Sequence, residues 1–187
     1  MKNKLTLSLF ILFISLTITS CFEVPEDVIV QGMTPLYADD YSDPRLVSTQ
    51  EPREIENQGI TRTFGDYIFV TEELKGIHVF EIQDLGQTVP VYFLNIIGIS
   101  EYSIQDNNLL CHNSRDFIGI DLSDLSDIEV FTVTETLPAG IFDNRFRNSV
   151  FYVPPNYEGL YECVRDDLGI VYDWVEELIT NPNCETL

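Results

Sequence analysis

The chain has 187 residues, enough for one domain with a hydrophobic core, and 44% of them are apolar, which excludes a disordered chain. Its 31 acidic and 10 basic residues give a net charge of −21. Such a surface repels nucleic-acid phosphates and anionic lipid headgroups, so we expect no nucleic-acid partner and no membrane attachment through charge.

Residues 1–20 have the pattern of a signal peptide. Lys2 and Lys4 give a short basic start, and residues 5–18 are apolar apart from scattered Ser and Thr. As a helix this run would reach about 21 Å, short of the roughly 30 Å hydrocarbon core of a bilayer. The length therefore favours a cleaved signal over the alternative, an uncleaved anchor helix.

The signal peptide ends in residues 18–21, ITSC, which resemble the lipobox of bacterial lipoproteins. The resemblance implies cleavage before Cys21, lipidation of Cys21 and a permanent anchor in the outer membrane of the cell envelope. An acidic cluster follows at residues 23–27. It resembles surface-export signals of some lipoproteins, or it is a solvated tether, so the side of the outer membrane that the protein faces stays open.

We divide the chain into a lipoprotein signal peptide (1–20), an acidic tether with an extended segment (21–50) and a β-repeat domain (51–187). Two sets of aspartates have spacings that suggest calcium: Asp39, Asp40 and Asp43, and then Asp121, Asp124 and Asp127. The second set lacks the glycine and the terminal glutamate of an EF-hand loop, and we favour turns capped by aspartate. The sequence predicts no metal site and no cofactor.

Two stretches of the middle region align at a spacing of 40 residues, GIHVFEIQDL at 76–85 and DFIGIDLSDL at 116–125. An apolar run precedes and another follows each stretch, at 67–70 and 89–96 and at 109–111 and 128–133. Their β-branched and aromatic residues predict strands, and apolar residues on both sides of the pleat predict a sheet covered on both faces. A period of 40 residues is typical of β-propeller blades.

The middle region resembles the LVIVD-repeat proteins, many of which are predicted bacterial lipoproteins. The resemblance rests on residues 52–59, 65–84 and 120–130, and it extends over about 31–184. It implies propeller-like β-blades and brings no established activity or catalytic residues. A closed propeller needs about four blades, and this chain has room for about three.

We therefore expect an all-β fold of propeller-like blades in an incomplete ring, with two clear repeats plus edge strands from the N- and C-terminal segments. Three ways of completing the fold stay open. The tail can supply further strands, the blades can form an open, capped sandwich, or the ring can close by self-association.

The tail predicts strands at 149–153, 159–163 and 169–179, with a helical turn at 173–178 as the alternative. An exported protein meets an oxidising compartment, so we expect a disulfide. Cys163 and Cys184 flank the last segment, and joining them would close a loop of about 20 residues, worth about 3 kcal/mol. Cys111 ends an apolar run and is expected to be a buried thiol; the other pairings stay open.

No catalytic motif is present, so we expect a non-enzymatic interaction or scaffold module with a protein or glycan partner in the envelope. The alternative is a surface glycan-binding accessory protein, suggested by the many tyrosines, and a hydrolase is the third hypothesis. Candidate binding residues are His78, Tyr157 and Trp174. His78 replaces an apolar residue of the second repeat, Ile118, which favours a hydrogen-bonded core or cleft histidine.

Overall fold

The computed structural model describes residues 27–135 and 150–185, and these residues are all-β, as the sequence predicts. Within these residues, thirteen strands form three sheets, none of which closes on itself. Short 3-10 turns, η1 (Asp84–Gly86) and η3 (Asp166–Leu168), lie between strands. No helix in this part of the chain is long and apolar enough to cross a membrane.

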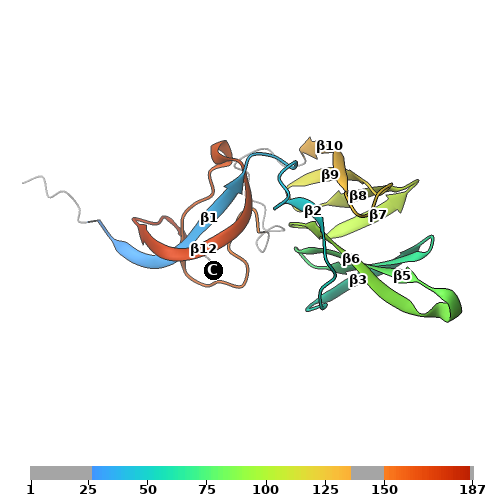
Figure 1. The fold of residues 1–187 in the computed structure, drawn as a ribbon. Coiled ribbons are helices and arrows are strands. Elements are labelled where there is room, and N and C mark those ends of the chain that lie inside the picture. Colours follow the sequence, from blue (N-terminus) through green and yellow to red (C-terminus); the bar gives the residue numbers. More distant parts are fainter. Residues whose placement is uncertain (1–26, 136–149, 186–187) are drawn as a thin grey trace, which may run out of the picture.

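The first sheet has five antiparallel strands in the order β2-β6-β5-β4-β3 (Figure 1). They are β2 (Val47–Gln50), β3 (Gln58–Phe64), β4 (Tyr67–Glu72), β5 (Gly76–Ile82) and β6 (Thr88–Ile96). Only two residues, Gly65 and Asp66, join β3 to β4, and Gly65 has the positive φ (+57°) that such short hairpin turns require.

The second sheet is a four-stranded antiparallel meander in the order β10-β9-β8-β7. Its strands are β7 (Glu101–Gln105), β8 (Asn108–His112), β9 (Asp116–Asp121) and β10 (Glu129–Glu135). A two-residue turn of Asp106 and Asn107, both with positive φ, joins β7 to β8. β9 begins 40 residues after β5, and each pairs with the strands that precede and follow it in the sequence.

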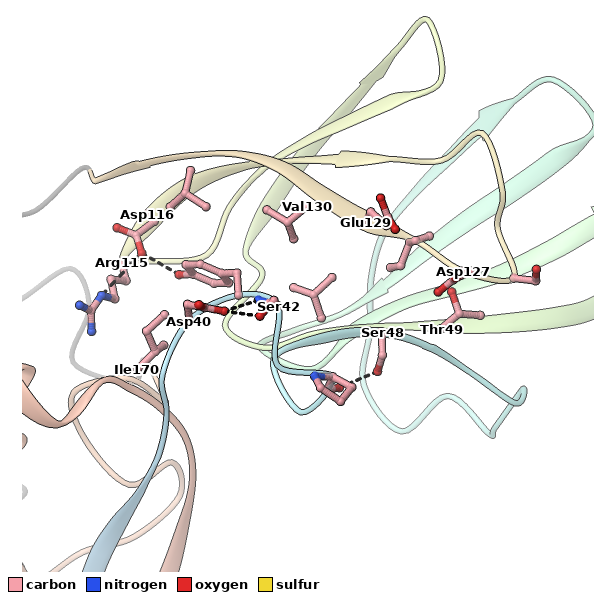
Figure 2. A pocket seen from close by; sticks show the side chains of 16 residues that line it. Asp40, Ser42, Ser48, Thr49, Arg115, Asp116, Asp127, Glu129, Val130 and Ile170 are labelled. Atoms are coloured by element: carbon pink, nitrogen blue, oxygen red, sulfur yellow. Dashed lines mark hydrogen bonds and ion pairs between the residues drawn. The ribbon is translucent and has the colours of Figure 1, made fainter.

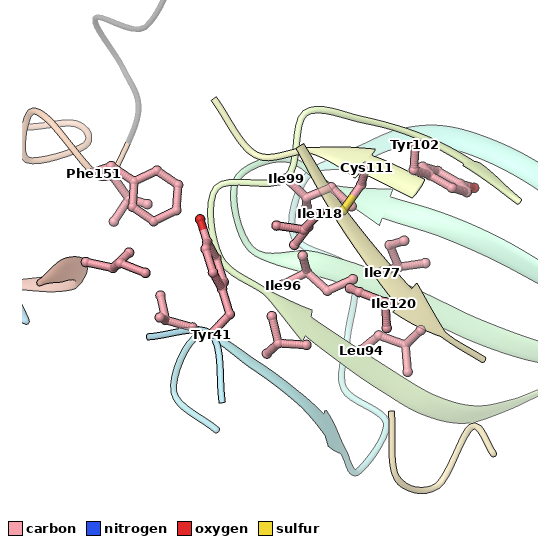
Figure 3. Close-up of a cluster of buried hydrophobic side chains, with 14 of the residues drawn as sticks. Tyr41, Ile77, Leu94, Ile96, Ile99, Tyr102, Cys111, Ile118, Ile120 and Phe151 are labelled. Carbon is pink, nitrogen blue, oxygen red and sulfur yellow. The ribbon is translucent and has the colours of Figure 1, made fainter. Parts of the chain in front are cut away.

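The inner faces of these two sheets share one hydrophobic core (Figure 3). The five-stranded sheet contributes fully buried side chains such as Ile77 and Leu94, and the meander contributes Ile118 and Ile120. The hydroxyl of Tyr102 donates to the Phe69 carbonyl at 3.0 Å, which ties the meander to β4. Each fully buried aliphatic side chain stabilises the fold by about 1.5–3 kcal/mol, so this stack is the main source of stability.

The outer faces of the two sheets differ. The segment between β2 and β3 covers the five-stranded sheet, since the Arg53 guanidinium lies 3.7 Å above the centroid of the Phe93 ring. On the outer face of the meander, Phe117 and Phe131 are 37% and 54% exposed. The expectation of a sheet covered on both faces therefore holds for the first repeat at Phe93 and His78, and it is wrong for Phe117 and Phe131 of the second, where Phe131 lies over Gly119.

The N- and C-terminal segments form a third sheet, which we call the terminal sheet, in the order β12-β1-β11-β13. Its strands are β1 (Ile29–Ala38), β11 (Leu160–Tyr161), β12 (Ile170–Thr180) and β13 (Cys184–Glu185). These strands add no edge to the two repeat sheets. Cys163 and Cys184 are joined by a disulfide with Cα atoms 5.3 Å apart, and Cys111 is a buried free thiol.

Within residues 27–50, which belong to the segment expected to be an acidic tether with an extended part, β1 and β2 are strands of the terminal sheet and of the five-stranded sheet. Two local expectations need correction. The strand expected at 149–153 is wrong for its described residues, 150–153, which form turns and a bend. Residues 173–178 lie in β12 and form no helical turn, because the whole strand pairs with β1 from Ile29↔Thr180 to Ala38↔Ile170.

Candidate functional site

A cleft of about 840 Å³ lies between β2 and β10, and we call it the β2–β10 cleft (Figure 2). β2 is the last strand of the five-stranded sheet and β10 the last strand of the meander, so two sheet edges border the cleft. Thr49 on β2 donates through its hydroxyl to the Leu125 carbonyl at 2.8 Å, which fixes the spacing of the edges. Val47, Ile128 and Val130 give the cleft an apolar lining.

Polar side chains stand at both ends of the cleft. Arg115 and Asp116 lie at one end, and Asp127 and Glu129 lie at the other (Figure 2). Asp40 also lines the cleft, and its Oδ1 accepts hydrogen bonds from the Ser42 amide and hydroxyl. These hydrogen bonds lower the pKa of Asp40, so the carboxylate stays ionised well below neutral pH. The rim of the cleft is therefore mostly anionic.

A buried hydrogen-bond network holds the Asp116 end in place. The Tyr41 hydroxyl donates to Asp116 Oδ2 at 2.7 Å, and it accepts a hydrogen bond from Asn113 Nδ2 at 2.7 Å. Asn113 Oδ1 accepts from the Asp116 amide at 2.7 Å, which fixes the turn before β9. Burial raises the pKa of Tyr41 far above its ordinary value, so the phenol stays protonated and remains a donor.

Arg115 links this end of the cleft to the terminal sheet. Its Nε lies 3.6 Å from Asp116 Oδ2, and its Nη1 lies 3.8 Å from Asp166 Oδ1 of η3. The contacts of Tyr41, Asn113, Asp116 and Arg115 thus connect the loop before β2, the meander and the segment before β12. Such an arrangement orders this end of the cleft.

His78 lies away from the cleft, in a buried ionic cluster on the outer face of β5. Its side chain is 2% exposed, and Nε2 lies 2.7 Å from Glu72 Oε2. The Glu72 side chain is completely buried and also forms ion pairs with Arg53 at 3.2 Å and with Lys75 at 3.0 Å. His78 is thus a hydrogen-bonded core histidine, which is the role that its apolar neighbours suggested.

The other two candidate binding residues are also away from the cleft. Trp174 is 8% exposed, donates through Nε1 to the Val150 carbonyl at 2.8 Å, and packs edge-on against Tyr161. Tyr157 is half-buried in the loop before β11. The structure therefore does not bring His78, Tyr157 and Trp174 together, and Trp174 belongs to the core.

Four of the six aspartates considered for calcium, Asp40, Asp43, Asp121 and Asp124, accept a hydrogen bond from the backbone amide two residues later and so cap turns. Asp121 Oδ1 accepts from the Ser123 amide, Asp124 Oδ1 from the Ser126 amide, and Asp43 forms an ion pair with Arg45. Among the described residues, no group of three or more His, Cys, Asp or Glu side chains is arranged to hold a metal ion.

Sequence reasoning missed Tyr41, Asn113 and Asp116. The polar residues 113–116 connect β8 to the start of β9, and a polar run between two apolar runs is a local signal that indicates a turn. Its partner Tyr41 lies more than 70 residues earlier, and no local pattern predicts that pairing.

We compared the chain with models of protein families, with curated proteins and with solved structures, and found no match in any of the three. Its function is therefore inferred from its own sequence patterns and from the geometry of its clefts.

Proposed function

We propose that the chain is an outer-membrane lipoprotein that serves as a non-enzymatic interaction module of the bacterial cell envelope, built from LVIVD-type β-repeats. The lipobox-like residues 18–21 support an anchor at Cys21, which lies outside the described residues. The start of β9, 40 residues after that of β5, supports the repeat.

In this proposal the five-stranded sheet and the meander are two neighbouring propeller-like blades, and the blades do not close into a ring. The segment carrying Arg53 covers one outer face, and residues of the terminal sheet, such as Val171, join the common core. This arrangement corresponds to an open, capped sandwich of blades.

The observation that carries the proposed function is the β2–β10 cleft. Open sheet edges offer backbone donors and acceptors to an added strand, and the apolar lining offers burial for every second side chain of that strand. The anionic rim, with Asp40, Asp127 and Glu129, selects partners with basic side chains. We therefore assign the cleft to an extended, basic segment of a protein partner.

A charge-reversal experiment tests this assignment. Asp127→Lys combined with Glu129→Lys should abolish recovery of the partner from solubilised envelope, measured by quantitative mass spectrometry. The matched control is Glu176→Lys combined with Glu177→Lys, which changes the charge equally on exposed positions of β12. The control should recover the partner as the wild type does.

Two results would overturn the assignment. One is a wild-type protein that enriches no partner over the cleft variant at any detergent strength. The other is an equal loss of the partner in the cleft variant and in the β12 variant, because the effect would then come from net charge alone.

A further inference from the structure

A second cavity, of about 500 Å³, lies between the five-stranded sheet and the meander where their hairpin turns meet. We call it the hairpin groove. The β3–β4 turn contributes Asp66, and the β7–β8 turn contributes Asn107. The loop between β9 and β10 forms another wall, and its Ser126 also lines the β2–β10 cleft, so the two cavities are neighbours.

Aromatic rings form one wall of the hairpin groove. Phe64, Tyr67 and Tyr92 are half-buried there, and Phe69 is buried beneath them. All four lie on one face of the sheet. Phe64 pairs with Tyr67 across the hairpin, and Tyr67 and Phe69 are two positions apart on β4. Phe69 pairs with Val79, which in turn pairs with Tyr92. This face is the one that packs against the meander, so the rings border the groove.

Polar residues on structured turns also line the groove. The Ile82 amide donates to the Asp66 carbonyl at 2.7 Å, and the Leu122 amide donates to the Asn107 carbonyl at 2.8 Å, so both turns are held through their backbones. Asp124 Oδ1 is held by the amide and hydroxyl of Ser126. Within the described residues, the side chains of Asp66 and Asn107 make no hydrogen bond, and both are exposed.

We propose that the hairpin groove binds a neutral saccharide. A pyranose ring has an apolar face of C–H groups, which stacks on an aromatic ring, and a rim of hydroxyls, which donate to carboxylate and amide oxygens. The tyrosines supply the stacking surface, and Asp66, Asn107 and Asp124 supply the oxygens. The same carboxylates and the net charge of −21 repel an anionic sugar or a phosphate.

This site is independent of the β2–β10 cleft as a place for a protein partner. The groove depends on side chains of β3, β4 and β6, on the two hairpin turns and on the β9–β10 loop, whereas the proposed strand addition depends on the open edges of β2 and β10. The two cavities share only Ser126 among their lining residues, so a variant that keeps Ser126 and changes one site should leave the other site working.

The test is a calorimetric titration of the acylated protein with a panel of neutral oligosaccharides. The protein is kept in a detergent whose headgroup is not a sugar. At least one oligosaccharide should bind, and Tyr92→Ala should weaken that binding by about tenfold or more. Tyr157→Ala is the matched control, a half-buried tyrosine outside the groove, and it should bind as the wild type does.

A second variant keeps the test decisive where Tyr92→Ala fails to fold. Asn107→Gly removes an exposed side chain and is compatible with the left-handed backbone of this residue (φ +63°). It should weaken binding of the same saccharide with little change in the unfolding midpoint. Asp127→Lys combined with Glu129→Lys should leave saccharide binding intact, so failure of the cleft assignment and failure of this one are distinguishable. The proposal would be overturned if no oligosaccharide of the panel bound, if only a cationic peptide bound, or if wild type, Tyr92→Ala and Asn107→Gly bound the saccharide equally.

Discussion

The carboxylate of Glu72 is a charge buried under a layer of basic side chains. Burial alone would raise the pKa of Glu72, but hydrogen bonds from His78 and Lys75 and the positive charges of Arg53 and Lys75 outweigh it. The pKa of Glu72 is therefore below its ordinary value of 4.5. Ionised Glu72 thus stabilises the folded state, and it also anchors the segment that covers β5.

We expect Glu72→Gln to lower the free energy of unfolding at pH 7 by about 2 kcal/mol, because the amide loses the ion pairs with Arg53 and Lys75. A carboxylate with a depressed native pKa contributes its stability above its unfolded pKa, and the contribution is lost as the pH falls through the native pKa. Urea denaturation of both proteins should therefore show a difference that is full at pH 7 and shrinks below about pH 4.5.

The control for this prediction is Glu56→Gln. Glu56 forms an ion pair with the same Lys75, but its side chain is 73% exposed, so we expect a change below about 0.5 kcal/mol. A difference between wild type and Glu72→Gln that grows in acid would contradict the assigned sign.

Among the elements, the connection from β6 to β7 is where the repeat sheets meet the tail. Gly98 in this connection has a φ of +79°, and a Cβ there would overlap Phe151 and lie 2.7 Å from the Asn113 carbonyl oxygen. Gly65 in the β3–β4 turn also has a positive φ, but a Cβ there would meet nothing within 4 Å. Comparing an alanine substitution at each glycine therefore separates the cost of backbone strain from the cost of a steric overlap.

We expect Gly65→Ala to cost about 1 kcal/mol, from the left-handed backbone alone. Gly98→Ala should cost about 3 kcal/mol, because displacement of Phe151 adds a packing penalty to the same strain. Urea denaturation of both variants measures the two values. Equal losses would show that Phe151 does not hold the tail to the repeat sheets.

The central strands were predictable because each is an apolar run bounded by Gly, Asn or Asp. β5 and β9 begin at Gly76 and Asp116, the first residues of the two stretches that align in the sequence. The pairing of β1 with β12 was not predictable, because Ile29 and Thr180 are distant in the chain and nothing local marks them as partners. The cleft was missed for the same reason, since it joins separate loops to two sheet edges.

At the scale of the whole molecule, attachment to the membrane should depend on one residue. We expect Cys21→Ala to move the protein from the membrane fraction to the aqueous fraction, because in the proposed lipoprotein acyl chains on Cys21 are the anchor and an acidic surface is not attracted to anionic headgroups. Cell fractionation with immunoblotting measures this, and Cys111→Ala is the control that should stay with the membrane. A Cys21→Ala protein that remains in washed membranes would refute the lipid anchor.

In the proposed lipoprotein, the ribbon formed by the long pairing of β1 with β12 would set the distance between the clefts and the lipid surface. β1 starts eight residues after Cys21 and runs for 10 residues, about 33 Å at the usual rise of a strand. Figure 1 shows β2 and β10, which border the β2–β10 cleft, and β3 and β6, which contribute to the hairpin groove, beyond the C-terminal end of β1. A protein anchored at Cys21, as we propose, would hold both cavities well clear of the headgroups, where molecules of the surrounding compartment reach them before neighbouring lipids do.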